Sequence, residues 1–312
     1  MEYRQLGDSD LRVSELCLGT WTTFGGSLDD GAAHELVDVA FELGINFFDT
    51  ANVYSGGRSE EVLGRALASR PRDSYIVATK VLWTAPDGGS GLSREQILTQ
   101  IDASLERLGM DFVDLYQCHA FDDEVPVAET LGALTEVVEA GKARYIGVSN
   151  WSGAQIRNAA DLAREHGFAK IVSSQPEYSL LQRDPEEDVI PASRENGVSQ
   201  IVYSPLAQGV LSGKYASGQE PPDGTRGSAR SEWMSWYLGD RNLARVQRLR
   251  PVAEGLGCSM AQLALVWILR EPNVAAAIIG ASKPEQVRDN AGASGVTLDD
   301  ATLRAIEDAL AG

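Results

Sequence analysis

The chain has 312 residues, of which 43% are hydrophobic, so it is long enough for two average domains or for one large barrel with a sizeable core. Its 45 acidic residues outnumber 27 basic ones, which gives a formal net charge of −18 at pH 7. Such a surface repels a nucleic acid backbone or an anionic membrane, so we expect neither as a partner. Any bound anion would need local cations or helix N-termini.

The cysteines and the N-terminal segment bear on redox state and location. Cys17, Cys118 and Cys258 lie far apart in the sequence without metal-ligand spacing, and we interpret them as reduced core residues. The first residues, MEYRQLGDSD, contain neither a basic segment nor an apolar run, and nowhere do 18 apolar residues follow one another. We therefore expect a soluble, cytoplasmic protein without a metal site.

The first predicted elements form a hairpin, and eight short apolar runs follow it. Residues 2–16 suggest two short strands about a GDSD turn, which could plug the bottom of a barrel. Near-continuous apolar strands that alternate with helical segments predict a parallel sheet covered by helices, and eight such units fit a closed (β/α)8 TIM barrel. A doubly wound sheet would show GxGxxG after the first strand, where this chain has LGTWTTFGG. The runs are 15–20, 45–50, 75–80, 112–119, 143–150, 170–175, 199–205 and 275–282.

Segments with helical spacing separate these runs. A long connection at 205–240, rich in Gly, Ser and Pro, follows the seventh strand, and loops of this length are usually functional. The tail at 297–312 predicts a last helix on the side of the barrel. We expect residues 1–312 to form a single domain. The clearest helical segments, several closed by glycine, are 32–44, 93–109, 127–141, 154–167 and 185–197.

Polar side chains stand at the ends of three consecutive strands. In a (β/α)8 barrel the active site forms at the C-terminal strand ends. The second strand ends in Asp49, with Tyr54 in its loop, the third ends in Lys80 and the fourth in His119. Only five of the 27 basic residues are lysines, so a lysine at this position is notable. A rim lysine paired with Asp49 and a hydrogen-bonded core histidine are the structural alternatives.

Several motifs resemble the aldo-keto reductases, and together they cover essentially the whole chain. They are LCLGTW, FFDTANVYSGGRSEEVLG, VATK, LYQCHAFD, ARYIGVSNW, SQPEYSLLQR, VYSPLAQGVLSGKY and IIGASKPEQVRDN. Within that family, SPLAQGVLSGKY and the GAS…EQ…N ending are most similar to the bacterial branch that resembles the potassium-channel β subunits. The resemblance implies NADPH-dependent reduction of aldehydes and ketones to alcohols by hydride transfer.

The resemblance also implies the role of each strand-end residue. Tyr54 would be the general acid that protonates the carbonyl oxygen. A phenol with a pKa of about 10 is a poor donor near neutrality, and the ammonium of Lys80 should lower that pKa. Asp49 would hold Lys80 in place, and His119 would donate a hydrogen bond to the same oxygen.

The cofactor implied by the resemblance is NADPH/NADP+. Tyr203 would stack on the nicotinamide, and loop backbone after the seventh strand would meet the pyrophosphate. Ser282 and Glu285 have capping-box spacing, which explains the GASKPEQ segment structurally, but Lys283 beside a helix N-terminus could also bind the 2′-phosphate. The cofactor residues implied are Gly19, Thr20, Trp21, Asp49, Ser149, Asn150, Gln175, Tyr203, Ser204, Pro205, Leu206, Gln208, Gly209, Leu211, Gly213, Lys214, Arg226, Gly280, Ser282, Lys283, Gln286 and Asn290.

The expected substrate is a small carbonyl compound bound at an aromatic rim. Because only a short tail follows the last barrel helix, we expect an open mouth that favours aryl aldehydes. Two alternatives stay open: a redox-sensing NADPH-binding subunit with slow turnover, and a sugar or alcohol dehydrogenase that works in the oxidative direction. The chain begins at the hairpin without an inactivation segment, which disfavours the first, and the oligomeric state stays open. The substrate residues would be Trp21, Tyr54, Trp83, His119 and Phe121, with Trp233, Trp236 or Tyr237 as further rim aromatics.

Overall fold

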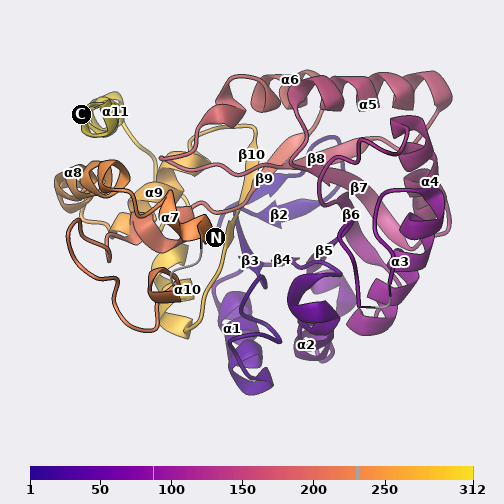
Figure 1. Ribbon diagram of the computed structural model, residues 1–312, viewed down its shortest axis with the longest axis horizontal. Helices are drawn as coiled ribbons and strands as arrows, with labels where there is room; N and C mark the ends of the chain where they lie inside the picture. The colour runs from indigo at the N-terminus through magenta and orange to yellow at the C-terminus, as the bar shows by residue number, and fades with distance from the viewer. Residues whose placement is uncertain (87, 230–231, 312) are drawn as a thin grey trace.

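Figure 1 shows the computed structural model, which describes residues 1–86, 88–229 and 232–311. Eight parallel strands close into a barrel in the order β10-β3-β4-β5-β6-β7-β8-β9. This confirms the predicted (β/α)8 TIM barrel, and each predicted apolar run supplies one strand. The strands are β3 (Leu16–Gly19), β4 (Phe47–Asp49), β5 (Ile76–Val81), β6 (Val113–Cys118), β7 (Ala143–Ser149), β8 (Ile171–Gln175), β9 (Ser199–Val202) and β10 (Val274–Ile279).

Helices surround the barrel (Figure 1), and some of them begin or end at a capping residue that the sequence supplies. Ser152 and Ser259 open two of them with full capping boxes, in which the serine and the third helical residue, a glutamine, bind each other's backbone. Gly109 and Gly167 each end a helix in the left-handed conformation, and the helix that Gly167 ends is the one that Ser152 opens. The helices are α1 (Asp30–Glu42), α2 (Arg58–Leu67), α3 (Arg94–Leu108), α4 (Val127–Glu139), α5 (Gly153–His166), α6 (Val189–Glu195), α8 (Asp240–Leu256), α9 (Met260–Leu269), α10 (Pro284–Ala291) and α11 (Asp300–Ala311).

The N-terminal hairpin closes one end of the barrel. Strands β1 (Tyr3–Gln5) and β2 (Arg12–Ser14) pair antiparallel. The buried side chains of Leu11 and Val13 join Phe47 and other barrel-interior residues in one apolar cluster. The hairpin therefore seals the end at which the parallel strands begin, as predicted, and leaves the end where they finish for the site.

One predicted helix has the wrong extent. Residues 185–197 form a short 3-10 turn, η3 (Asp184–Glu186), and then α6, with Asp188 between them. Asp188 has a φ of −136°, outside the helical region, and its carboxylate accepts a hydrogen bond from Gly153 N at 2.7 Å. The helix begins after Asp188 because that residue binds the first turn of α5 instead.

The connection after β9 is folded into short helical pieces. It contains η4 (Ala207–Ser212), η5 (Arg226–Ala229) and α7 (Glu232–Ser235) before α8 begins. The last helix, α11, packs against α8 on the outside of the barrel, as predicted (Figure 1). Among the described residues no single helix has the length and composition to span a membrane. Only α8 and α9 together do, and they are bent by 87°.

Candidate active site

Four polar side chains converge where β4, β5 and β6 end. Lys80 Nζ donates to Asp49 Oδ1 at 2.5 Å and to Tyr54 Oη at 3.2 Å. His119 Nε2 lies 3.5 Å from Tyr54 Oη. Tyr54 opens the 3-10 turn η1 (Tyr54–Gly57) after β4, and this turn places its ring over the neighbouring strand ends. Because β4, β5 and β6 are adjacent in the barrel, the predicted convergence of the four residues is present.

Lys80 is a fully buried ammonium held by three acceptors. Its side chain has no exposed surface, and besides Asp49 and Tyr54 it donates to the Thr50 carbonyl oxygen at 2.8 Å. Burial alone would lower the pKa of Lys80, but the Asp49 carboxylate and the Tyr54 oxygen raise it above its usual value. The lysine therefore carries a fixed positive charge beside the Tyr54 hydroxyl.

Burial sets the pKa of Tyr54 more strongly than its charged neighbours do. Loss of solvent raises the pKa of this phenol above its ordinary value, the Lys80 ammonium lowers it, and the Asp49 carboxylate raises it again. The lowering effect predicted for Lys80 is present, but burial, which was not predicted, outweighs it, so the pKa of Tyr54 is raised overall. The Tyr54 hydroxyl is protonated at neutral pH, and Lys80 reduces the cost of its ionisation.

His119 is neutral across the physiological range. Burial, with the nearby Lys80 ammonium, lowers the pKa of His119 to about 3. The ring packs edge-on against Tyr54, with centroids 5.5 Å apart, and near Trp83, at 6.4 Å. Among the described residues its Nδ1 has no hydrogen-bond partner. A neutral imidazole in this position can donate one N–H hydrogen bond without adding charge.

The ends of β7, β8 and β9 carry a connected set of polar groups. Asn150 Nδ2 donates to the His119 carbonyl oxygen at 3.1 Å, and Tyr203 Oη donates to Asn150 Oδ1 at 2.9 Å. Ser149 Oγ donates to the Gln175 carbonyl oxygen at 2.8 Å. The structure thus brings together Ser149, Asn150, Gln175 and Tyr203, which were all predicted as cofactor residues. Through His119 it connects them to the tetrad of Asp49, Tyr54, Lys80 and His119.

The segment after β9 has an unusual backbone. Ser204, Ala207 and Gln208 have positive φ values of 51°, 46° and 57°, and Gly209 follows at 92°. For residues other than glycine this region costs about 1 kcal/mol each and is enriched at functional sites. Backbone N–H groups in such turns can point the same way and bind an anion. Pro205, Leu206, Leu211 and Gly213 lie in the same segment, with Leu211 fully buried.

Arg226 connects the long connection with the first loop of the barrel. Its guanidinium donates to Gln208 and to Thr22 Oγ1, the latter at 3.0 Å, and it stacks over the Trp21 ring at 5.3 Å. A Cβ built on Gly280 would lie 3.6 Å from the same guanidinium. Arg226 therefore lies among several predicted cofactor residues. Thr22, with a φ of 66°, was not predicted.

The start of α10 differs from the prediction. The N-cap is Lys283, and neither Ser282 nor Glu285 forms the expected capping box. Instead Gln286 Oε1 accepts from Ser282 N at 2.8 Å and from Ser282 Oγ at 3.3 Å. With Lys283 as the N-cap and Pro284 as the first helical residue, Gln286 is the third helical residue and accepts the hydrogen bond that was expected of Glu285. Lys283 is exposed at this helix start.

Other predicted residues lie at the same end of the barrel. Gly19 ends β3, and Thr20 Oγ1 donates to the Asp49 carbonyl oxygen at 3.1 Å. The ammonium of Lys214 lies beside Gly209, since a Cβ there would be 2.9 Å from Nζ. Asn290, in α10, is buried.

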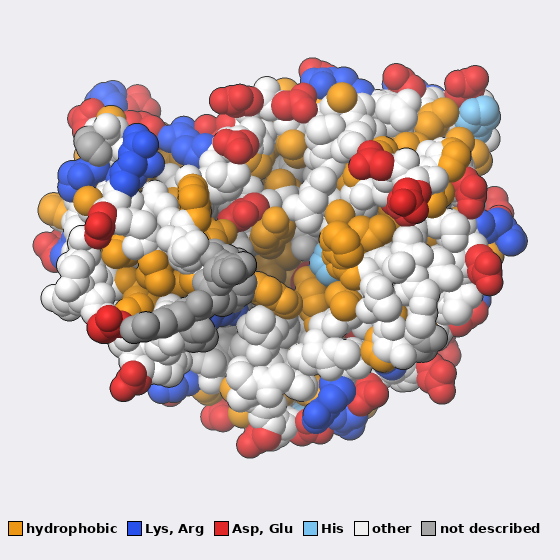
Figure 2. Space-filling model, viewed as in Figure 1, with side chains coloured by type: hydrophobic (Ala, Val, Ile, Leu, Met, Phe, Trp, Pro, Cys, Tyr) orange, Lys and Arg blue, Asp and Glu red, His pale blue; other side chains and the backbone are white. Residues whose placement is uncertain are grey.

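Aromatic side chains line the mouth, where hydrophobic groups gather around a hollow in Figure 2. Trp21, Trp83 and Trp236 are 41%, 51% and 52% exposed. Phe121 packs against Trp151 with ring centroids 4.9 Å apart. The side chain of Trp233 lies outside the described part of the chain. A cavity of about 620 Å³ opens here, lined by Trp21, Glu177, Gln182, Tyr203, Ser204, Gln208, Trp236 and Tyr237.

Glu177 is a carboxylate in this cavity that was not predicted. Burial raises the pKa of Glu177, and its carboxylate accepts a hydrogen bond from the Tyr237 hydroxyl. This contact ties the end of the long connection to the segment after β8. Glu177 lies two residues after Gln175, which ends β8. Inspection of the C-terminal strand ends, which identified Asp49 and Lys80, could therefore have identified Glu177 as well.

Comparison with known proteins finds matches along nearly the whole chain. The model of the Aldo/keto reductase family matches residues 15–311. A probable voltage-gated potassium channel subunit beta from Oryza sativa subsp. japonica is 40% identical over 295 residues, which cover 93% of this chain and 90% of that protein. With the closed barrel and the polar groups at its mouth, these matches show that the chain belongs to the aldo/keto reductase family.

Proposed function

We propose that this oxidoreductase reduces aldehydes and ketones to alcohols with NADPH, and that Tyr54 is the general acid. The observation that supports this most directly is the position of Tyr54 Oη, 3.2 Å from Lys80 Nζ and 3.5 Å from His119 Nε2 at the barrel mouth. We also propose one domain and a cytoplasmic location, where free thiols such as those of the three unpaired cysteines persist.

The chain's own residues divide the proton chemistry between them. Tyr54 would give its hydroxyl proton to the carbonyl oxygen, and Lys80 would stabilise the phenolate that remains. Asp49 and the Thr50 carbonyl oxygen hold Lys80 in position. His119, neutral because of its burial, would donate an N–H to the same carbonyl oxygen and so orient it. NADPH, when bound, would supply the hydride.

The residues around the mouth fit a nicotinamide dinucleotide phosphate. The positive-φ segment from Ser204 to Gly209 offers backbone N–H groups to a pyrophosphate. Arg226, near Gly280, and Lys214, beside Gly209, add positive charge in a protein that is otherwise acidic. Lys283 at the start of α10 is suited to a 2′-phosphate, because a helix N-terminus favours anions.

The substrate class follows from the rim. The exposed Trp21 and Trp236 line a cavity of about 620 Å³, and the exposed Trp83 lies beside His119, so all three offer stacking surface to a planar apolar group. A flat aromatic ring can stack on such side chains, whereas the saturated ring system of a steroid has no π face for stacking. We therefore propose broad reduction of aldehydes, with aryl aldehydes reduced fastest and ketones more slowly.

A substrate panel followed by NADPH absorbance tests this function. We expect kcat/KM to be highest for aryl aldehydes, lower for ketones and lowest for steroids, with little discrimination within each class. A steroid or a phosphorylated sugar preferred over every aryl aldehyde by a hundredfold or more would contradict the proposed rim. Absence of any NADPH-dependent reduction across the panel would contradict the reductase itself.

The comparison supports a second candidate function. A relative named as a probable potassium channel subunit beta is 40% identical along most of both chains, so this chain could bind NADPH tightly and turn over slowly as a redox-sensing subunit. Stopped-flow measurement of NADP+ release separates the two functions. Release faster than the chemical step favours a free-standing enzyme, and release that limits turnover to well below 1 s⁻¹, against an enzyme median of about 10 s⁻¹, favours the sensor.

A further inference from the structure

A buried hydrogen bond crosses the barrel between opposite strands. Gln175, at the end of β8, donates from Nε2 to Asp49 Oδ2 at 2.9 Å. Strands β4 and β8 lie four strands apart in either direction around the closed barrel. Both residues are 3% exposed, so the bond runs through the interior below the mouth.

This bond occupies the second oxygen of a carboxylate whose first oxygen binds Lys80. Asp49 Oδ1 accepts from Lys80 Nζ at 2.5 Å, while Oδ2 accepts from Gln175. Donors on two sides prevent the carboxylate from rotating about its Cβ–Cγ bond. The backbone of Gln175 is fixed in turn, because its main-chain carbonyl oxygen accepts hydrogen bonds from Ser149 Oγ at 2.8 Å and from Asn150 N at 3.3 Å.

The same bond also fixes which way the Gln175 amide faces. A carboxylate paired with an ammonium accepts hydrogen bonds and cannot donate them, so the NH2 group of Gln175 must face Asp49. Oε1 then points away from Asp49, and no donor contacts it in the part of the chain that the structure describes. Gln175 can therefore offer only an acceptor to a ligand.

We propose that Gln175 is a positioning residue that holds Asp49 across the barrel, and through it Lys80 beside Tyr54. The bond itself does not depend on the proposed function. Its effect on proton donation by Tyr54 does rest on that function. Without Gln175, Asp49 can rotate, Lys80 Nζ can leave its 3.2 Å contact with Tyr54, and proton donation slows.

The bond can be tested in the apo-protein by exchanging the two groups. Gln175→Glu places two carboxylates against each other, and Asp49→Asn removes the charge that faces Lys80. In the double variant, the amide introduced by Asp49→Asn keeps an oxygen as acceptor for Lys80. Its NH2 group can donate to the carboxylate introduced by Gln175→Glu, so the hydrogen bond is restored with donor and acceptor exchanged. We expect the double variant to have a higher Tm than either single variant. A Tm of the double variant at or below the lower single value would overturn the bond.

The effect on Lys80 and Tyr54 is tested at saturating NADPH with Gln175→Met, which roughly keeps the volume and removes the whole side-chain amide, both its donor and its oxygen. We expect kcat to fall about tenfold, with little change in KM for the aldehyde, as for a loss of positioning. Because Lys80 lowers the pKa of Tyr54, a displaced lysine lets that pKa rise, and the loss of activity at alkaline pH begins at a higher pH. The other titratable groups around the pair are Cys17, His119 and Tyr203, and the substitution leaves them in place.

Gln200→Met is the matched control. Gln200 is also buried, in β9, but it donates to Asn273 Oδ1 at 3.0 Å near the closed end of the barrel. We expect kcat and the pH profile of this variant to match the wild type, whatever its Tm. If the wild type reduces aldehydes but Gln175→Met keeps its kcat and pH profile, the inference fails and the proposed function stands. If the wild type does not reduce aldehydes, the proposed function fails, and the exchange of residues 49 and 175 still tests the bond.

Discussion

At the scale of single residues, burial determines the charge of each group in the site. It raises the pKa of Tyr54 and lowers the pKa of His119 to about 3, so both are neutral at physiological pH. Lys80 is the exception, because Asp49 and Tyr54 outweigh the effect of its burial on the pKa. The result is a buried Lys80–Asp49 ion pair beside two neutral hydrogen-bonding groups. Because the ammonium also contacts the Tyr54 hydroxyl, the arrangement is suited to stabilising negative charge on that oxygen.

Tyr54→Phe should lower carbonyl reduction by 10²-fold or more, because it removes the proton donor. NADPH affinity, measured by fluorescence titration, should change little, because the ring remains. Lys80→Met should behave likewise. Turnover by Tyr54→Phe at more than about a tenth of the wild-type rate would show that another group donates the proton.

The low pKa of His119 also makes the fold sensitive to acid. The unfolded chain binds a proton on this ring below about pH 6.5, whereas the folded protein does not until about pH 3. Stability is therefore lost as pH falls below 6.5, on the order of 2 kcal/mol between pH 7 and pH 5. In urea unfolding, the free energy of unfolding of His119→Asn should therefore fall less between pH 7 and pH 5 than that of the wild type. His166→Asn, which changes an exposed histidine, is the control and should follow the wild type.

The convergence of the tetrad could be predicted from the sequence, but its outer contacts could not. Consecutive parallel strands are neighbours, so three strand-end residues in chain order must meet at one edge. The bond from Gln175 to Asp49 joins opposite strands and depends on side-chain conformation. The contact of Arg226 with Thr22 joins loops whose backbone no local pattern specifies.

At the scale of elements, strand ends were predictable and helix starts were less so. Each apolar run became a barrel strand, because a parallel sheet buried on both faces requires continuous apolar sequence. The predicted start of α10 was wrong because Gln286, and not Glu285, accepts the hydrogen bond from Ser282 N, and the N-cap is Lys283. The break at Asp188 arose from a contact with α5, which the sequence of α6 does not reveal.

Lys283→Glu should weaken the binding of NADPH more than the binding of NADH. The exposed lysine at the start of α10 would face the 2′-phosphate that only NADPH carries, so its reversal should weaken NADPH binding about tenfold or more and NADH binding far less. Lys170→Glu makes the same charge change before β8, at the other end of the barrel, and is the control. Equal losses for both cofactors would place the 2′-phosphate elsewhere.

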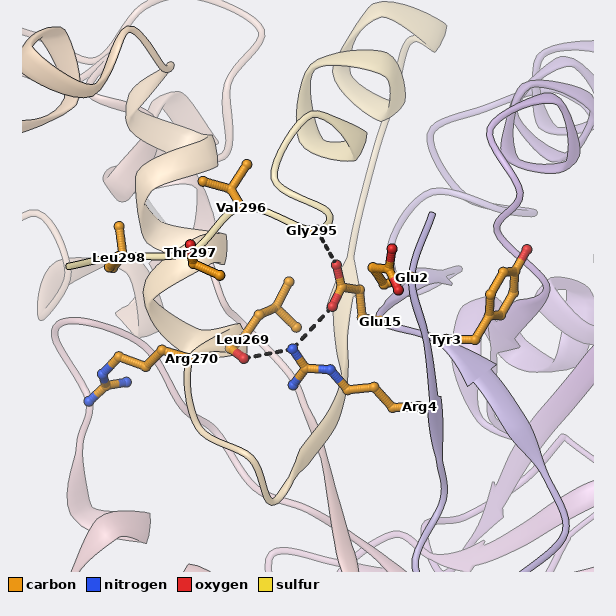
Figure 3. Close-up of a pocket in the computed structure, with 10 residues that line it drawn as sticks. All are labelled: Glu2, Tyr3, Arg4, Glu15, Leu269, Arg270, Gly295, Val296, Thr297 and Leu298. Carbon is orange, nitrogen blue, oxygen red and sulfur yellow. Dashed lines mark hydrogen bonds and ion pairs between the residues drawn. The ribbon is translucent and has the colours of Figure 1, made fainter.

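At the scale of the whole molecule, a clip at the closed end joins segments from both ends of the chain (Figure 3). Arg4, in β1, donates to the carbonyl oxygens of Leu269 and Val274, each at 2.7 Å, and pairs with Glu15 at 3.1 Å. Glu15 also accepts from Gly295 N at 2.8 Å. These groups border a cavity of about 510 Å³, opposite the proposed site. The clip therefore connects hairpin, barrel and the segment before α11.

Arg4→Met should destabilise the protein without changing its chemistry. It leaves the buried Glu15 carboxylate without its cation, at a cost of about 2 kcal/mol in the free energy of unfolding. Urea unfolding measures that cost, and kcat should stay at the wild-type value because the clip lies at the far end of the barrel. Arg288→Met removes an exposed ion pair with Glu42 and should have a much smaller effect. A large drop in kcat for Arg4→Met at full folding would show that the two ends are coupled.

Because the chain contains only five lysines, labelling with an amine-reactive reagent can report ligand binding at individual lysines. Lys80 has no exposed surface, so such a reagent cannot modify it while the barrel is folded. Lys142 and Lys170 precede β7 and β8 and lie at the closed end, where they serve as internal references. Lys214 and Lys283 follow β9 and β10 at the mouth. Mass spectrometry of two peptides against two references would therefore report occupancy of the mouth without any turnover.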